Sequence, residues 1–562
     1  MKKTIYFSCL LIFSALTSFS ATFYVSPDGQ NGAAGTYSEP FFLIQEAIDN
    51  CGSGNDTILL MEGTYWQRFA FSGKSNILLN SYNPFDKSTI SGSGVDGTVQ
   101  VFIENCDSIF LSNLIFRENY AQEARCIYAI GAGNGLFVSD CEFFNCGWGA
   151  DPDADPESFS PVRQSNAILV NGREAEPWNN VYIGRNFLND LVLGNSEAIT
   201  LTGNVTNFLI EDNHIHDITN IGIDVAGHYS WAYPAEGDQA LNQTRNGRIR
   251  RNTIYNCQRP LEGNEPAGIY ADGAASVYID NNEVFASGSG ISVGCEVPGF
   301  TALNINVVGN ILYSNTRFGA VFGANAGIIE DCVFRNNTLF NNGAFFDNSG
   351  AVSLQKSIDS EIQNNIIYVL NSDFYGLSLF GWQVDNLVLE KNLFYCPGGE
   401  NARVYAFNPA EGSTYTEESL WFDNPGFVSD NPLSPHFQLT LSSPAVNSGS
   451  QNVELIPDET DMNGLPVVLD GIDVGAYMSD LSTFLNANES EPLLYPVPAS
   501  SVIYFRLPAE DISIYSIDGR LVETSEGRFQ SYDVSNLPEG IYLLRFKSSN
   551  EERSSRLLVT QH

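Results

Sequence analysis

The chain has 562 residues and carries 27 Lys and Arg against 66 Asp and Glu, which gives a formal net charge of −39 at pH 7. A protein that binds nucleic acid needs a basic surface for the phosphates, and this composition cannot supply one over the whole chain. We therefore expect no nucleic-acid partner, and any local cluster of basic residues stands out.

The first 21 residues predict a secretory signal peptide. They combine Lys2 and Lys3 with an apolar run that is too short to span a bilayer, followed by small residues up to Ala21. No later segment has eighteen or more consecutive apolar residues, so we expect no transmembrane segment in the mature chain.

Nine cysteines follow the signal peptide, and an odd number cannot all pair within the chain. Export permits disulfides, and Cys141 with Cys146 is a candidate pair. Several cysteines lie in apolar, strand-like runs, where a buried free thiol is equally favoured. We assign disulfides no role.

Short β-like runs that follow an Asn recur along the chain. The recurring residues are Asn186, Asn213, Asn252, Asn282, Asn310, Asn337, Asn365 and Asn392. Their successive spacings are 27, 39, 30, 28, 27, 28 and 27 residues. A unit of this length predicts stacked coils, with one insertion after Asn213 and a larger one before Asn186. An Asn at one fixed turn of each coil predicts a ladder of stacked side-chain amides.

Each unit also carries a second strand that opens with Gly or Ala. These strands are AITLTG at 198, GIDVAG at 222, GIYADG at 268, GISVGC at 290, GAVFGA at 319, GAVSLQ at 350 and GLSLFG at 376. Strands of five or six residues with turn residues between them, and no helical periodicity, indicate a parallel β-solenoid. Each coil of such a solenoid buries its apolar side chains only against its neighbours.

With these features the chain resembles the right-handed parallel β-helix proteins of the pectin-lyase-like class. Its N-terminal segments FYVSPDGQNGAAGT, FFLIQEAIDN and DTILLMEGTYWQ are similar to the entry and capping helix of that class. The resemblance implies an all-β fold, a right-handed single-stranded parallel β-helix with an N-terminal cap, over residues 22–422. It does not imply one activity, because the fold carries lyases, hydrolases, epimerases and adhesins.

The segments that follow also resemble known families. Residues 423–480 resemble the terminal segment of secreted bacterial β-helices, and we expect them to close the open end of the solenoid. Residues 481–493 are expected to be a linker. Residues 494–562 resemble the type IX secretion sorting domain, with four short alternating strands, an IDG turn and a PEG turn that predict a small β-sandwich.

The sorting domain implies the type IX secretion machinery as a partner. It also implies a Bacteroidetes-type outer-membrane route, with a secreted or cell-surface location. We expect the chain to be a monomer.

Three acids are candidates for catalysis. The apolar second and fourth positions of the Gly-opened strands point into the solenoid, so Asp224, Asp272 and Glu296 are expected to face outward on consecutive coils. Each acid lies two positions later in its segment than the one before, which predicts neighbouring Cβ atoms about 8 Å apart. Carboxylates at that distance can reach the 6.5–9.5 Å of inverting glycosidases or, with a bulge at Gly294 and Cys295, the roughly 5 Å of retaining ones.

The segment GIYAD, with an acid one coil later, resembles β-helical glycosidases whose nucleophile and acid/base occupy adjacent coils. That resemblance implies that Asp272 is the nucleophile or base and Glu296 the acid. The alternative is that these acids belong to the ordinary surface of a very acidic chain.

Other side chains near these strands are candidates for assistance. His228 follows GIDVAG directly, whereas His216 is expected to fill the turn position that Tyr255 and Tyr313 fill in later coils. Glu197 precedes AITLTG at a corner whose orientation the pattern leaves open.

The insertion at 228–243 contains three aromatic residues. Tyr229, Trp231 and Tyr233 could form a stacking platform for a sugar ring, since insertions in solenoids usually form loops on the binding face. The alternative is a loop that packs its own aromatic side chains.

Five arginines follow the insertion within residues 245–259. Arg248 and Arg250 flank the inward Ile249 and are expected to face out, where they could bind uronate or sulfate groups together with Arg245. The alternative is that they neutralise nearby acids. The run DPDADPE at 151–157 is either a Ca²⁺ ligand or a solvated acidic loop.

Three functions are consistent with this sequence. The first is a glycoside hydrolase that cleaves a polysaccharide with Asp272 and Glu296, assisted by Asp224 and His228. The second is a uronate-specific polysaccharide lyase of the pectate- or alginate-lyase kind, with an Arg or His228 as base and Ca²⁺ open as a cofactor. The third is a non-catalytic protein that binds surface glycans or acts as an adhesin.

Overall fold

The computed structural model describes residues 20–149, 164–258, 266–343, 349–371, 373–397, 404–479, 494–495, 501–516, 521–538, 540–548 and 551–559. Almost all of the predicted signal peptide, the acidic run at 151–157, Arg259 and the predicted linker lie outside these residues. The chain divides into two compact units, residues 1–479 and 480–562.

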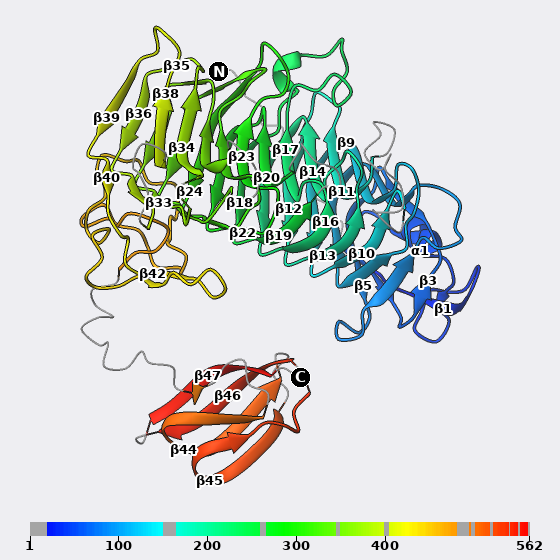
Figure 1. The fold of residues 1–562 in the computed structure, drawn as a ribbon. Helices are drawn as coiled ribbons and strands as arrows, with labels where there is room; N and C mark the ends of the chain where they lie inside the picture. Colours follow the sequence, from blue (N-terminus) through cyan, green and yellow to red (C-terminus); the bar gives the residue numbers. More distant parts are fainter. Residues whose placement is uncertain are drawn as a thin grey trace, which may run out of the picture. The chain divides into compact units, whose positions relative to one another are not determined.

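The first unit is a parallel β-solenoid whose coils each contribute strands to three series. Consecutive coils pair in parallel within each series, as the stacked arrows of Figure 1 show. Series 1 consists of β4 (Phe69–Ser72), the first halves of β7 (Val99–Ser112) and β9 (Arg125–Ser139), β11 (Asn166–Gly172), β14 (Ile199–Gly203), β17 (Ile223–Ala226), β20 (Ala267–Asp272), β23 (Ser289–Gly294), β26 (Phe318–Phe322), β30 (Gly350–Leu354), β34 (Tyr375–Phe380) and β38 (Tyr405–Asn408).

Series 2 follows series 1 along the chain in each coil. It consists of β1 (Thr22–Gln30), β2 (Asp56–Leu60), β5 (Ser75–Ser81), the second halves of β7 and β9, β12 (Trp178–Gly184), β15 (Val205–Glu211), β18 (Arg245–Arg250), β21 (Ala275–Asp280), β24 (Thr301–Val308), β27 (Ile328–Glu330), β28 (Val333–Arg335), β31 (Ser357–Ile358), β32 (Glu361–Gln363), β35 (Val384–Asp385), β36 (Leu387–Glu390) and β39 (Tyr415–Glu418).

Series 3 completes each coil. It consists of β3 (Thr64–Tyr65), β6 (Ser88–Ser91), β8 (Leu114–Arg117), β10 (Glu142–Gly147), β13 (Phe187–Val192), β16 (His214–Thr219), β19 (Thr253–Gln258), β22 (Glu283–Phe285), β25 (Ile311–Tyr313), β29 (Thr338–Phe340), β33 (Ile366–Tyr368), β37 (Leu393–Tyr395) and β40 (Trp421–Phe422). The predicted solenoid is therefore confirmed.

The core of the solenoid follows the alternation of the series 1 strands. Ile223 pairs with Ile269 and Val225 with Ala271 on the next coil, and none of the four side chains is exposed to solvent. Burying such apolar faces coil against coil provides the main driving force for stacking. The inward positions predicted from the sequence are confirmed.

The predicted amide ladder is also present. From Asn213 to Asn392, the side-chain oxygen of each Asn accepts hydrogen bonds from the backbone N–H and the amide of the Asn one coil earlier. The oxygen of Asn186, the first of the series, accepts the backbone N–H of Cys141. The amide of each also reaches a backbone carbonyl; Asn282, for example, donates to the carbonyl of Ile249 at 2.9 Å. The ladder satisfies buried backbone groups at the turn between series 2 and series 3.

Replacing Asn282 by Ala should lower the free energy of unfolding by at least about 3 kcal/mol, because several buried polar groups lose their partners at once. Chemical denaturation of the full chain measures this loss. Asn306→Ala is the matched control, since Asn306 is half-buried outside the ladder and bonds only to Asn304 among the contacts described. Equal stability of the two variants would contradict a structural role for the ladder.

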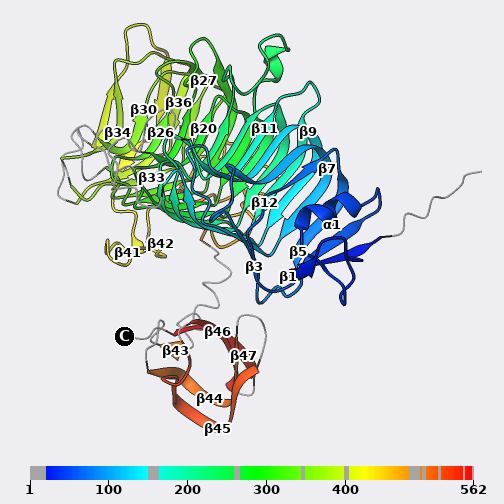
Figure 2. The ribbon, with the colours of Figure 1, turned by 90° about the vertical axis from the view of Figure 1, so that its right-hand side faces the viewer.

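The N-terminal end carries the expected capping helix. Helix α1 (Ile44–Asn50) buries Ile44, Ala47 and Ile48 against β1 and β4, and it lies at the first coils in Figures 1 and 2. The cap covers apolar side chains that no earlier coil could cover.

Residues 423–479 run along the side of the solenoid, whereas the sequence led us to expect them across its open end. Their antiparallel strands β41 (Phe427–Ser429) and β42 (His436–Leu439) pack on aromatic residues of series 3, including Tyr313 and Phe340. Both ribbon views show this hairpin beside the coils.

Residues 423–479 lie there because several coils carry outward side chains, apolar ones and one arginine, that are buried only when this segment covers them. The apolar side chains pack against Phe437 and Leu439, and the buried Arg335 forms an ion pair of 2.7 Å with Glu459 of the covering segment. A buried charge of this kind requires such a partner.

The second unit forms an antiparallel sheet with its own apolar core. Its strands are β43 (Leu494–Tyr495), β44 (Val502–Ser516), β45 (Leu521–Asp533), β46 (Gly540–Ser548) and β47 (Glu551–Val559), with β44 between β45 and β46. The four main strands are longer than the short strands expected.

All nine cysteines after the signal peptide lie in the described residues, and all are free thiols. The candidate disulfide between Cys141 and Cys146 is therefore wrong: each thiol instead lies buried within the apolar core. Within the described ranges, no helix is long and apolar enough to cross a membrane.

Candidate functional site

The candidate acids occupy successive rows of series 1. Asp224 pairs with Tyr270, and Asp272 pairs with Ala226 on one side and Gly294 on the other. Each acid is thus displaced by two residues from the previous one, so the predicted diagonal arrangement is confirmed. The acids point out of the solenoid core, yet Asp224 and Asp272 are only 6% and 2% exposed.

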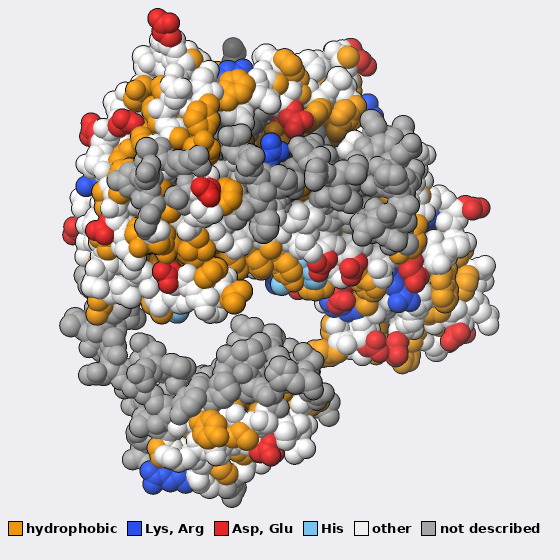
Figure 3. Space-filling view, viewed as in Figure 1, with side chains coloured by type: hydrophobic (Ala, Val, Ile, Leu, Met, Phe, Trp, Pro, Cys, Tyr) orange, Lys and Arg blue, Asp and Glu red, His pale blue; other side chains and the backbone are white. Residues whose placement is uncertain are grey.

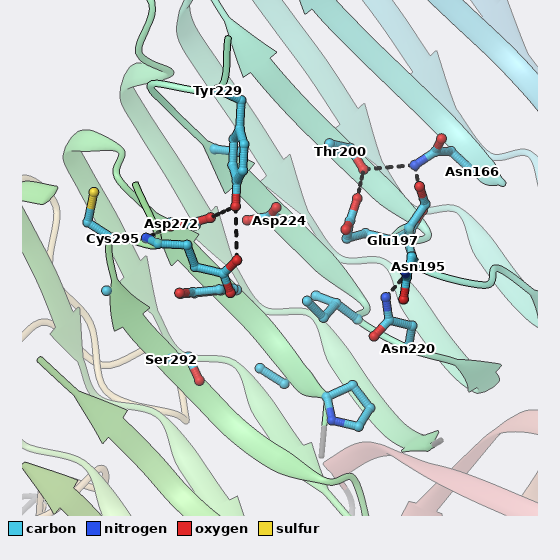
Figure 4. Close-up of a pocket in the computed structure, with 18 of the residues that line it drawn as sticks. Asn166, Asn195, Glu197, Thr200, Asn220, Asp224, Tyr229, Asp272, Ser292 and Cys295 are labelled. Carbon is cyan, nitrogen blue, oxygen red and sulfur yellow. Dashed lines mark hydrogen bonds between the residues drawn. The ribbon is translucent and has the colours of Figure 1, made fainter. Parts of the chain in front are cut away.

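A tyrosine from the insertion explains this burial and joins two of the acids. Tyr229 donates a hydrogen bond of 2.5 Å from its hydroxyl to Asp272 Oδ2, and the same hydroxyl lies 3.1 Å from Glu296 Oε2. The two carboxylate oxygens therefore lie no more than about 5.6 Å apart, the sum of those distances. Asp272 Oδ1 also accepts the backbone N–H of Glu296 at 2.8 Å. Figure 4 shows Tyr229 reaching toward Asp272, with Asp224 beside them.

Burial and mutual repulsion change the acidity of this group. Burial, followed by the charge of Glu296, raises the pKa of Asp272 to about 7, against a partial lowering by its bonds to Tyr229 and the backbone. Burial and the charges of Glu197, Asp272 and Glu296 raise the pKa of Asp224 well above its usual value. The pKa shift of Asp224 therefore favours its neutral form, and Asp272 exchanges its proton near pH 7.

The acids lie in a pocket of about 850 Å³ on the outward face of series 1. The lining residues run from Arg125 of β9 to Gln355, which directly follows β30, so the pocket extends along the solenoid axis. Glu197 lies at its side, where its carboxylate accepts a hydrogen bond of 2.8 Å from Thr200, which in turn contacts the Asn166 amide. Trp231, 54% exposed, lines the pocket near Tyr229, with ring centroids 6.0 Å apart.

Six of the eleven residues predicted for the site line this pocket: Glu197, Asp224, Tyr229, Trp231, Asp272 and Glu296. Tyr233 does not, because it is 3% exposed and packs inside its own loop near Gly237. His228 does not either, because its ring stacks on Phe300 at 4.4 Å. Burial removes water from the His228 ring and thereby lowers its pKa.

The predicted arginine cluster lies on another part of the coil. Arg245, Arg248 and Arg250 belong to β18 of series 2, whose outward face is not the face of the pocket. Arg248 pairs with Asp280 at 2.7 Å and Arg250 with Glu211 at 2.8 Å. Arg248 and Arg250 thus neutralise structural acids, and Arg245 donates to the backbone carbonyl of Gln243. None of the three lines the pocket, so the prediction that they hold substrate at the carboxylates is corrected.

His216 is in register with Tyr255, as expected, but this position lies within strand β16 and is not a turn. Its ring stacks on Tyr255 at 4.8 Å, and the column continues through Phe285 to Tyr313. In Figure 3 imidazole groups lie at the lower edge of the solenoid beside hydrophobic and acidic side chains. The role of His216 is therefore packing on the outside of series 3.

Tyr270, Thr200, Ser292 and Asn166 also line the pocket, although the sequence did not single them out. Thr200, Asp224, Tyr270 and Ser292 form one row of register partners across four coils. In the sequence, these four residues share the third position of their Gly- or Ala-opened strands. That shared position could have identified them, but they form one surface only when the coils stack.

Family comparisons agree with this architecture. The family described as "Right handed beta helix region" matches residues 240–402, and the family described as "Secretion system C-terminal sorting domain" matches residues 493–560. The chain is a right-handed parallel β-helix protein with a C-terminal domain for type IX secretion. That domain directs the β-helix protein to secretion.

The β-helix protein also resembles individual proteins. "Uncharacterized protein YwoF" of Bacillus subtilis (strain 168) is 28% identical over 366 residues, which are 61% of this chain and 73% of that protein.

Among solved structures, a GH136 lacto-N-biosidase from Eubacterium ramulus is 13% identical, with a TM-score of 0.42 over 72% of this chain and 68% of that one. The periplasmic alginate epimerase AlgG is 11% identical, with a TM-score of 0.41 over 68% and 83% of the two chains. Pectate lyase Pel9A is 15% identical, with a TM-score of 0.36 over 82% and 97%. Similarities of this size say nothing about activity.

Proposed function

We propose that this β-helix protein is a glycoside hydrolase that cleaves a polysaccharide bound in the series 1 pocket. The observation that carries the proposal is the pair Asp272 and Glu296, whose oxygens share the Tyr229 hydroxyl within about 5.6 Å of each other. Glycosidic bond hydrolysis needs two carboxyl groups in different protonation states on either side of one bond. The exposed ring of Trp231 offers a surface on which a sugar can stack.

The environment of each acid supports a distribution of roles. Asp272 is buried and keeps its proton up to about pH 7, which suits the acid that protonates the departing glycosidic oxygen. Glu296 is exposed at the pocket surface, which suits the carboxylate that attacks the anomeric carbon. This distribution reverses the roles implied by the resemblance of GIYAD to known glycosidases, because Asp272 is the more buried of the two.

The short separation supports a retaining mechanism. Retaining enzymes hold their carboxyl groups about 5–5.5 Å apart, whereas inverting enzymes need about 6.5–9.5 Å to admit a water. In this scheme Glu296 forms an ester with the sugar as Asp272 gives its proton to the leaving oxygen. Asp272 then takes a proton from the water that cleaves the ester, so both residues return to their starting states.

The lyase alternative has less support. That alternative needed an Arg or His228 as base, and His228 and the arginines of β18 lie outside the pocket. Arg125 and Arg173 line the pocket, but they belong to rows three and four coils away from Asp272. The charges of Glu296 and Glu197, which raise the pKa of Asp272, also oppose a uronate at the cleavage point.

Product analysis tests the proposal. The full chain, incubated with a panel of neutral and acidic polysaccharides, should release new reducing ends without absorbance near 235 nm. Proton NMR should show that the product first formed keeps the anomeric configuration of the substrate. Unsaturated products absorbing near 235 nm would favour the lyase, and cleavage of no polysaccharide, with unchanged glycan binding by Asp272→Asn, would favour a binding protein.

A further inference from the structure

Charges are segregated along the pocket. Of the described residues that line it, the only cations are Arg125 of β9 and Arg173, which directly follows β11. Four acids line the pocket, and all of them lie in later coils. Glu197 lies just before β14, and Asp224, Asp272 and Glu296 follow in the next three coils. Coils stack about 4.8 Å apart, so the arginine rows lie about 14 to 19 Å from the row of Asp272, the span of a short oligosaccharide.

The arginine end has the features of a binding site. The Arg125 side chain is 15% exposed, and its guanidinium lies 5.0 Å from the centre of the Tyr128 ring. Its Nε is buried without a hydrogen-bond partner, and its nearest acid contact is Glu123 Oε2 at 3.7 Å from the guanidinium. A buried donor of this kind is costly unless a partner arrives.

A second polar group at this end also lacks a partner. Asn171 lines the pocket beside Arg173, is 2% exposed, and has an amide oxygen without a hydrogen-bond partner. Arg173 itself is exposed. This end of the pocket thus offers two guanidinium groups for an anion and one acceptor for a sugar hydroxyl or amide N–H.

We propose that the substrate carries an acidic sugar at the arginine end and a neutral sugar at the cleaved bond. The inference rests on the proposed function for the position of the cleaved bond, and it adds the substrate class. Guanidinium groups bind carboxylates and sulfates through charge-assisted hydrogen bonds. The charged carboxylates beside Asp272 repel the same anions. A polymer therefore fits the pocket if its anionic group lies several sugar residues away from the glycosidic bond that is cleaved.

Binding measurements test the inference apart from cleavage. Full-length Asp272→Asn is used to prevent turnover. Affinity electrophoresis compares glucuronoxylan, xanthan and chondroitin sulfate with the same polymers after reduction of their carboxyl groups or removal of their sulfates. At least one acidic polymer should bind about tenfold more tightly than its uncharged counterpart, as one charge-assisted contact allows. The homopolymer polygalacturonate should bind more weakly than that polymer.

Arginine variants identify the source of the preference. Two variants are compared with Asp272→Asn: one adds Arg173→Gln, and the other adds both Arg173→Gln and Arg125→Gln. Both should lose the tenfold preference for the acidic polymer and bind the uncharged polymer as before. Arg185→Gln is the matched control, because it removes the same charge from an exposed side chain outside the pocket lining. Melting temperatures of all variants show whether each is folded, and the single Arg173→Gln variant, at an exposed position, serves if the double variant unfolds.

Two results would overturn the inference: no acidic preference in any of the three polymers, or a preference that survives in the arginine variants. Either result leaves hydrolysis of a neutral polymer intact. Conversely, arginine-dependent binding without cleavage by the wild-type chain would remove the proposed hydrolase activity and keep the acidic subsite.

Discussion

Asp272→Asn should lower kcat on a polysaccharide by about 10²- to 10⁴-fold, the usual contribution of a positioned general acid. The amide keeps the size of the side chain but cannot give a proton to the departing oxygen. For an aryl glycoside with a good leaving group, kcat/KM should fall much less, because this parameter reports the first step and the departure of such a group needs little protonation. Reducing-end release and aryl-alcohol release from the same variant measure the two effects.

Glu296→Gln should be equally damaging on both substrates, since both require the attack of this carboxylate on the anomeric carbon. Asp331→Asn is the control for both variants: Asp331 is an exposed acid at a turn of the solenoid outside the pocket lining. Wild-type rates in Asp272→Asn or Glu296→Gln would exclude the paired-acid mechanism.

Tyr229→Phe should move the alkaline limb of the pH–kcat profile to higher pH by about one pH unit or more. The Tyr229 hydroxyl donates to Asp272 and thereby stabilises its ionised form, which lowers the pKa of Asp272. Without the hydroxyl, the pKa of Asp272 rises above its value of about 7. Because the acid acts in its protonated form, activity then persists to higher pH. A hydrogen bond to a charged group contributes roughly 1.5–3 kcal/mol, and 1.36 kcal/mol corresponds to one pH unit.

The pH profile separates this role from simple packing. Tyr255→Phe removes a hydroxyl from the aromatic column of series 3 and should leave the limb in place. A Tyr229→Phe enzyme with a slower rate but an unchanged limb would mean that Tyr229 only supports the loop, and that it does not set the acidity of Asp272.

Much of the solenoid could be predicted because its code is local and repeated. The fixed spacing from Asn186 to Asn392 predicted the amide ladder, since only one side chain per turn has to be recognised. The covering of series 3 by residues 423–479 could not be predicted in the same way. It depends on contacts such as Arg335 with Glu459, which join residues 124 positions apart and leave no periodic signal.

The diagonal of Asp224, Asp272 and Glu296 followed from strand alternation alone. The arginine cluster was misplaced because alternation shows whether a side chain faces outward, and cannot show which of three outward faces it joins. The relation of Arg125 and Arg173 to the acids was invisible for a similar reason: these residues become neighbours of the pocket only when coils stack.

By itself the sequence determined the solenoid, its inward residues, the amide ladder and the order of the three acids, because each follows from a short repeat read one coil at a time. The tertiary structure decided the protonation of those acids and the polarity of the pocket. Both depend on burial and on charges that distant segments bring together: Tyr229 of the insertion covers Asp272, and Glu296 of the next coil adds its charge.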